Sequence, residues 1–118
     1  MTAVLVAVGG ACGVLARYGI GKATLHTDAL MWSTVGINIV GSFLLGLLAA
    51  EHWFSRDVRE ALGVGFLGGF TTFSTFSVQV VLDVDGGEPW RALGYVLASV
   101  LGGIAAATCG YVLGRKLA

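Results

Sequence analysis

Four apolar stretches, separated by short charged segments, decide what class of structure this chain can form. They run over residues 3–20, 30–50, 61–82 and 92–113. Each is about twenty residues long, which is what a helix needs to cross a bilayer core of roughly 30 Å. Hydrophobic residues make up 56% of the chain and charged residues only 12%, too few to give a water-soluble domain its polar surface. The sequence predicts an all-α membrane protein, with residues 1–118 forming a single four-helix transmembrane domain.

The third stretch is interrupted near its middle by a run of glycine, hydroxyl and phenylalanine residues, GGFTTFSTFS at residues 68–77. Apolar sequence leads into this run and continues beyond it. An unpaired backbone group in hydrocarbon is costly, so an interrupted helix survives there only inside protein or beside a water-filled path. The run therefore predicts that the third helix is broken mid-membrane, where a polar species is held or passed.

Charge and motif content exclude several classes of function. The formal net charge is zero, so nothing points to nucleic acid as a partner. No aspartate or glutamate lies within the four stretches, although a proton-coupled cation transporter normally keeps such a carboxylate in the membrane. The sequence also lacks a Ser-His-Asp set, a metal-spaced His/Cys cluster and a phosphate loop. We predict that the protein is not an enzyme.

The basic residues are almost evenly divided between the two sides of the membrane. With four spans, both termini and the middle loop share one side, which carries Arg56, Arg59, Arg115 and Lys116. The other side carries Lys22, Arg91 and, if it lies near the end of the first span, Arg17. Four cations against three give only a weak positive-inside signal. Two alternatives stay open: termini on the inner side, or dual topology with both orientations inserted.

Size and glycine content indicate how the helices associate. Four helices packed around a core leave little room for a pore, so we expect a transport path to need a second subunit. Three pairs of glycines spaced four residues apart allow helix backbones to approach closely. These pairs are Gly9 with Gly13, Gly65 with Gly69, and Gly110 with Gly114. Because such pairs are common in membrane helices, one pair alone does not identify a specific interface.

Two polar side chains within the spans each have two possible roles. Asn38, near the middle of the second span, either forms a hydrogen bond between helices or presents a donor to a pathway. Arg17, near the end of the first span, either extends to the membrane interface beside Tyr18 or provides a cation near an anion path.

Hydroxyl and aromatic side chains add to this polar set. Tyr95 and Ser99 are four residues apart and share one face of the fourth helix. Thr75 supplies another hydroxyl. Phe73 and Phe76 are three residues apart, and an aromatic ring is electropositive at its edge. Donors and ring edges together favour a small anion, whereas the alternative role of the two phenylalanines is packing in the core.

Three segments carry a resemblance to a known family. Residues 68–77, GINIVGSFLLG at 36–46 and GGACGVLARY at 9–18 resemble the Fluc (CrcB) family of fluoride channels. The chain is also similar to that family in length, span number and motif order. The resemblance implies a fluoride-selective channel of the cell inner (plasma) membrane that exports cytoplasmic fluoride by passive electrodiffusion. It also implies an antiparallel, dual-topology homodimer with a structural sodium ion at its centre.

The same resemblance implies roles for individual residues. The side chains that would line the fluoride pathway are Asn38, Phe73, Thr75, Phe76, Tyr95 and Ser99. The backbone carbonyls of Gly68 and Thr71 would hold the sodium ion, and Arg17 would lie near the aqueous vestibule. The sequence departs from the family at Gln79, where some members carry a glutamate near the pore.

Three other interpretations stay open. One is a small four-span multidrug exporter of dual topology, against which the missing mid-membrane carboxylate argues. Another is a membrane scaffold in which the broken helix serves only packing. The third is one subunit of a heteromeric fluoride channel, because some relatives consist of two different subunits.

Overall fold

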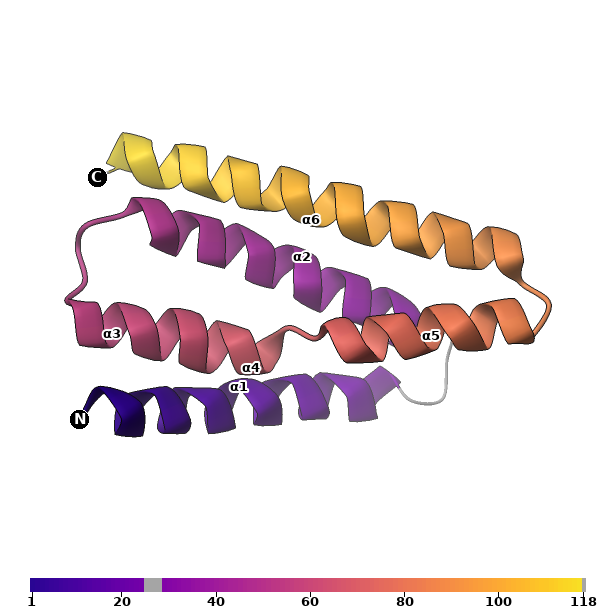
Figure 1. The fold of residues 1–118 in the computed structure, drawn as a ribbon, viewed down its shortest axis with the longest axis horizontal. Helices are drawn as coiled ribbons and strands as arrows, with labels where there is room; N and C mark the ends of the chain where they lie inside the picture. Colours follow the sequence, from indigo (N-terminus) through magenta and orange to yellow (C-terminus); the bar gives the residue numbers. More distant parts are fainter. Residues whose placement is uncertain (25–28, 118) are drawn as a thin grey trace.

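The computed structural model describes residues 1–24 and 29–117, and every regular element in these ranges is a helix (Figure 1). The elements are α1 (Thr2–Thr24), α2 (Ala29–Ala50), α3 (Arg56–Glu60), η1 (Ala61–Leu67), α4 (Gly68–Phe70), α5 (Phe73–Asp85) and α6 (Pro89–Leu117). Within the described residues, four helical segments are long and apolar enough to cross a membrane, namely Thr2–Thr24, Met31–Ala50, Arg56–Asp85 and Pro89–Leu117. The predicted all-α protein with four membrane spans is confirmed.

The spans lie side by side along the long axis of a molecule that measures 48 × 29 × 19 Å (Figure 1). Helix α6 runs along α2, and α1 runs along the line formed by α3, η1 and α4. Both termini and the α2–α3 loop lie at one end of the molecule, whereas the α5–α6 turn lies at the other. Four membrane crossings require this arrangement, since an even number returns the chain to the side on which it began.

Glycines bring α1 into backbone contact with the segment formed by η1 and α4. A Cβ built on Gly69 would lie 2.6 Å from the carbonyl oxygen of Gly10. A Cβ on Gly13 would overlap the carbonyl oxygen of Phe66. Two of the predicted glycine pairs therefore meet in one helix contact, where no larger side chain fits unless the helices move apart.

The third glycine pair serves the contact between α2 and α6. A Cβ on Gly114 would lie 2.6 Å from the carbonyl oxygen of Leu47, and a Cβ on Gly110 would overlap that of Phe43. This backbone contact explains why α6 lies so closely along α2 in Figure 1.

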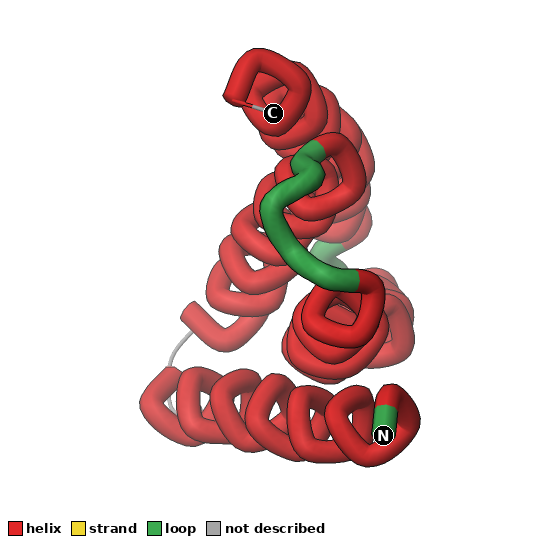
Figure 2. Tube along the Cα trace, turned by 90° about the vertical axis from the view of Figure 1, so that its left-hand side faces the viewer, coloured by secondary structure: helices red, strands yellow, loops and turns green. Residues whose placement is uncertain are grey.

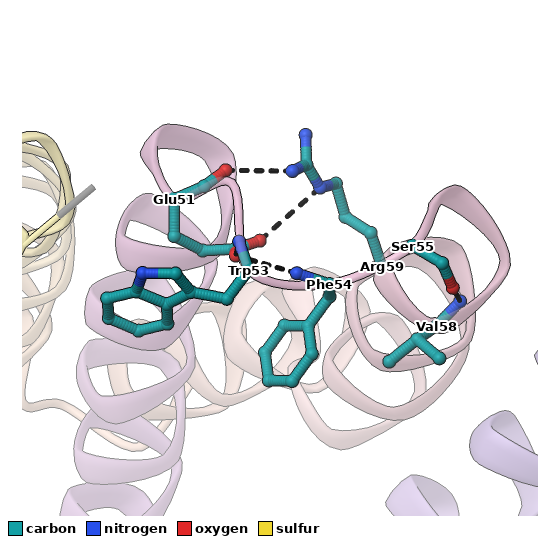
Figure 3. A network of polar contacts seen from close by, with 6 residues as sticks. All are labelled: Glu51, Trp53, Phe54, Ser55, Val58 and Arg59. Atoms are coloured by element: carbon teal, nitrogen blue, oxygen red, sulfur yellow. Dashed lines mark hydrogen bonds and ion pairs between the residues drawn. The ribbon is translucent and has the colours of Figure 1, made fainter.

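A buried carboxylate holds the loop between α2 and α3 (Figure 3). Glu51 is 1% exposed, and its Oε2 accepts hydrogen bonds from the backbone amides of Trp53 and Phe54. Arg59, on α3, donates to the Glu51 backbone carbonyl at 2.8 Å, and its Nε lies 3.4 Å from Glu51 Oε1. A buried charge is tolerated only when it is paired and hydrogen-bonded. The network therefore fixes the start of the third span against the end of α2.

An ion pair closes the turn between α5 and α6 at the opposite end. Arg91 Nη2 lies 2.6 Å from Asp83 Oδ1, and Arg91 Nε donates to both carboxylate oxygens at 3.1 and 3.2 Å. Within the turn, Gly87 has a φ of 83°, a left-handed conformation that side chains other than glycine rarely adopt.

The hydrophobic core of the described residues is small, and its central cluster joins Met31 and Val35 of α2 to Phe76 of α5 and Tyr95 of α6. The described buried hydrophobic residues are few: Met31, Val35, Ile37, Leu48, Ala50, Leu67, Phe76, Ala92 and Tyr95. Helices α1 and α6 lie at opposite edges of the molecule (Figure 2). Within a bilayer no hydrophobic force drives the helices to share one core. Beyond this cluster, glycine contacts join α1 to η1–α4 and α2 to α6, and broad apolar faces stay uncovered.

Candidate functional site

Two residues with extended backbone interrupt the third membrane-crossing segment. Helix α4 ends at Phe70 and α5 begins at Phe73. Between them, Thr71 has φ and ψ of −83° and 157°, and Thr72 has −152° and 121°. Both threonines satisfy nearby backbone groups, because Thr71 Oγ1 donates to the Leu67 carbonyl at 2.9 Å and Thr72 Oγ1 accepts from the Thr75 amide at 3.3 Å. Thr72 is thus the N-cap of α5, a position that favours a hydroxyl side chain.

Asn38 on α2 binds the backbone of this interruption through two hydrogen bonds. Its Nδ2 donates to the Thr72 carbonyl at 3.0 Å, and its Oδ1 accepts from the Thr72 amide at 2.9 Å. Of the two roles that the sequence left open for Asn38, the structure therefore has the bond between helices. This bond does not exhaust the amide, since Nδ2 carries a second hydrogen.

The same contacts divert the amides that would pair with two backbone carbonyls. In a continuous helix the amide of residue i bonds to the carbonyl of residue i−4, so Thr72 would bond to Gly68 and Thr75 to Thr71. Here the Thr72 amide donates to Asn38, and the Thr75 amide donates to the Thr72 hydroxyl. The carbonyls of Gly68 and Thr71, the two predicted sodium ligands, are thereby released from their helical donors.

Arg17 is also bound at the interruption. Its Nε donates to the Gly69 carbonyl at 3.2 Å, which ties α1 to the C-terminal end of α4. Carbonyls at a helix end lack helical donors and carry partial negative charge, so a guanidinium is favourable there. Arg17 therefore contacts the interruption in this structure and does not extend toward the membrane interface.

A hollow of about 460 Å³ lies beside the interruption and brings several predicted site residues together. Those among its lining are Asn38, Gly68, Thr71, Phe73, Phe76 and Ser99. The hollow is an open groove, walled by α2, α6 and the α4–α5 interruption. Its lining also includes Ser42 and Thr72, to which sequence reasoning assigned no role. The spacing of four residues from Asn38 to Ser42 is a signal that could have identified Ser42.

A second hollow, of about 440 Å³, lies on the other side of Thr72. Its lining includes Arg17, Tyr18, Lys22, Thr72 and Thr75, and Thr72 belongs to both hollows. Two basic side chains make this second hollow favourable for anions. The structure thus separates Thr75 and Arg17 from the other predicted site residues by the interruption itself.

The three aromatic residues predicted at the site differ in exposure. Phe76 is 9% exposed, and its ring centroid lies 5.7 Å from that of Phe73 and 5.0 Å from that of Tyr95. Phe73 is 78% exposed in the single chain. Tyr95 is completely buried, and its hydroxyl donates to Gln79 Oε1. Tyr95 lines neither hollow and supports Phe76 from behind.

The sequence matches one family over most of its length. The family model described as CrcB-like protein, Camphor Resistance (CrcB), matches residues 4–111. Among curated proteins, the chain is 44% identical over 118 residues to the fluoride-specific ion channel FluC of Thermus thermophilus, with 96% of this chain and 94% of the relative covered. It is 42% identical over 120 residues to the FluC of Gloeobacter violaceus, with 97% and 96% covered. It is 43% identical over 122 residues to that of Rhizobium leguminosarum bv. trifolii, with 98% of each chain covered. The chain belongs to the CrcB family of multi-pass membrane proteins.

Proposed function

We propose that this protein is a fluoride-selective ion channel that releases cytoplasmic fluoride by passive electrodiffusion across the plasma membrane. The observation that carries the proposal is the convergence of Asn38, Phe73, Phe76 and Ser99 on one groove at an interrupted membrane helix. The similarity to relatives named fluoride-specific ion channels supports the same ion. Neither the family nor the site has the features of an enzyme.

Fluoride entering the groove must exchange its hydration for protein donors. The second hydrogen of Asn38 Nδ2 and the Ser99 hydroxyl supply such donors, and the ring edges of Phe73 and Phe76 supply positive electrostatic potential. Among the described residues, no ionised side chain lines this groove. A path must bind an ion well enough to admit it and weakly enough to release it, which neutral donors achieve.

The flanking residues have supporting roles in this proposal. Arg17 and Lys22 attract the anion to the second hollow, which is the vestibule. The Thr75 hydroxyl lines the same hollow and offers a hydrogen bond to the ion between the vestibule and the interruption at Thr72. Tyr95 lies outside both hollows, and its role in this proposal is to hold the ring of Phe76 while its hydroxyl bonds to Gln79.

The working unit is an antiparallel, dual-topology homodimer. Three observations support this assembly: the groove is open on one side, Phe73 is 78% exposed, and the described residues form no core that encloses a pore. A second copy in the opposite orientation covers such a groove, and two copies give two pathways. The nearly even distribution of basic residues suits insertion in both orientations.

A sodium ion at the dimer centre fits the carbonyl chemistry of the interruption. The carbonyls of Gly68 and Thr71 have lost their helical donors to Asn38 and Thr72. Backbone carbonyls of unwound membrane helices are suitable ligands for sodium. The carbonyls of Gly68 and Thr71 would hold the ion, which would supply a fixed positive charge beside the interruption.

Fluoride efflux from liposomes tests the function. The purified protein is reconstituted in liposomes loaded with potassium fluoride, and a fluoride electrode records efflux after valinomycin is added. We expect rapid fluoride loss and no chloride loss from matched liposomes. A well-folded dimer that releases no fluoride would contradict the proposal and favour a heteromeric channel or a scaffold, and drug resistance conferred on cells would favour the multidrug exporter.

Asn38→Asp separates a channel from a scaffold in the same assay. The carboxylate keeps an acceptor for the Thr72 amide but loses the donor to the Thr72 carbonyl, and it places negative charge beside the anion path. We expect this variant to lose fluoride efflux.

A further inference from the structure

We propose that Ser42 is a further residue of the fluoride path. Its hydroxyl and that of Ser99 form a second position, next to Asn38, at which fluoride accepts hydrogen bonds. This inference rests on the proposed channel function. Ser42 follows Asn38 by four residues, so the two side chains share one face of α2. Both line the groove at the interruption. The two positions are about 6 Å apart along the helix axis, at 1.5 Å per residue.

The facing wall of the groove places a glycine opposite Ser42. This wall belongs to α6, where Ser99 and Gly103 are also four residues apart and share one face. A Cβ built on Gly103 would lie 3.6 Å from Ser42 Oγ. Because glycine has no Cβ, the groove keeps beside the Ser42 hydroxyl the space that a methyl group would fill at ordinary contact distance.

The Ser99 hydroxyl is the group that indicates a ligand. Its Oγ is buried and has no hydrogen-bond partner among the described residues. Other hydroxyls in the spans bond to the carbonyl four residues earlier, as Ser77 does to Phe73 and Thr108 to Ile104. Leaving a buried donor unpaired is unfavourable. An anion between α2 and α6 satisfies Ser99 and accepts from Ser42 across the groove.

Fluoride efflux from variants of the full-length protein tests this assignment. We expect Ser42→Ala to lower the efflux rate about tenfold, because it removes a hydrogen bond to a charged ion. Ser42→Thr should retain most of the rate, since it keeps the hydroxyl. Thr108→Val is the matched control: it removes a span hydroxyl that bonds to its own helix and does not line the groove, and we expect it to match the wild-type rate.

Two further variants make the test independent of any effect on folding. Gly103→Ala leaves Ser42 in place but puts a methyl group 3.6 Å from its hydroxyl, so it should also slow efflux. The double variant Ser42→Ala with Ser99→Ala should lose less than the product of the two single losses, because both hydroxyls serve one ion. Wild-type efflux with an unchanged Ser42→Ala rate would overturn the assignment alone, whereas no efflux from wild-type protein would overturn the channel function and this inference together.

Discussion

At the scale of single residues, the structure shows one of the two roles that the sequence left open for Asn38, and the proposed function gives it the other as well. A side-chain amide has both an acceptor and a two-hydrogen donor. The acceptor and one hydrogen bind the Thr72 backbone, and the other hydrogen remains for an anion. Neither aspartate nor leucine supplies this set of groups. The residue that stabilises the interruption is therefore also suited to the ion path beside it.

Substitutions of Phe73 and Phe76 should differ in their effect on the stability of the protein but have the same effect on fluoride efflux. We expect Phe76→Ile to destabilise the protein by about 1–2 kcal/mol, because its buried ring contacts Tyr95. Phe73→Ile should change stability by less than about 0.5 kcal/mol in the monomer, because its ring is largely exposed. Both variants should abolish fluoride efflux. Thermal unfolding of the monomeric protein in detergent measures stability, and efflux from liposomes measures transport.

The control is that each variant still forms the dimer, which size-exclusion chromatography measures. Normal efflux from both variants, with the dimer intact, would remove the ring-edge role of the phenylalanines. Equal destabilisation by the two substitutions would contradict the difference in burial.

The sequence could predict the kinds of residue at the site better than their contacts. Polar side chains are costly inside a membrane span, and phenylalanines beside a run of hydroxyl residues are unusual there. These features identified four residues that the structure brings to one groove, namely Asn38, Phe73, Phe76 and Ser99. The burial of Tyr95 could not be predicted, because it depends on how α5 packs against α6. Hydrophobic patterns do not encode the hydrogen bond from Tyr95 to Gln79.

At the scale of elements, the third span is assembled from pieces with different geometry. Segment η1 is a π-helix in which the amide of Gly68 reaches back to the carbonyl of Gly63. Such wide turns are rare and commonly occur near functional sites. The sequence predicted a break within residues 68–77 through its hydroxyl residues and glycines, and extended backbone lies at Thr71 and Thr72 within that run. It could not indicate η1, because a segment that is apolar on all sides has no periodicity to reveal a change in helical turn.

The glycine contact between α1 and η1–α4 should be intolerant of even one methyl group. We expect Gly13→Ala to destabilise the protein by about 1–3 kcal/mol, because the added Cβ overlaps the Phe66 carbonyl and the helices must separate. Gly19→Ala is the matched control on the same helix, since a Cβ there meets nothing within 4 Å. Thermal unfolding in detergent compares the two. Equal stability of both variants would show that the contact tolerates a larger separation.

At the scale of the whole molecule, the single chain is an open assembly of paired helices. Its uncovered faces are apolar, and Phe73 and the groove lie on the surface of the chain. The sequence predicted the number of spans from length and hydropathy, but it did not predict this openness, because apolar residues facing lipid and those facing a core have the same composition. A second copy is the partner that such a surface fits under the proposed function.

If the protein inserts in both orientations, changing the basic residues at the two ends of the molecule should fix one orientation. His52 and the C-terminal end of α6 lie at the end with the termini, and Asp85 and Glu88 lie at the other end. His52→Lys with Leu117→Lys changes the basic residues from four against three to six against three. Lys116→Gln with Asp85→Lys and Glu88→Lys changes them to three against five. Each set should fix one orientation, opposite to the other, because basic residues are retained on the inner side.

If the active unit is antiparallel, cells expressing either charge variant alone should lose fluoride efflux, because every copy inserts in one direction. Co-expression of the two variants should restore efflux, since oppositely inserted copies can then pair across the groove. A label reactive toward a cysteine added at the C-terminus, applied from outside, reports orientation: it should reach a fraction of wild-type copies and nearly all or none of each variant. Full efflux from a variant with a single orientation would exclude the antiparallel dimer, and it would leave a parallel assembly or a path within one chain as the explanation for the open groove.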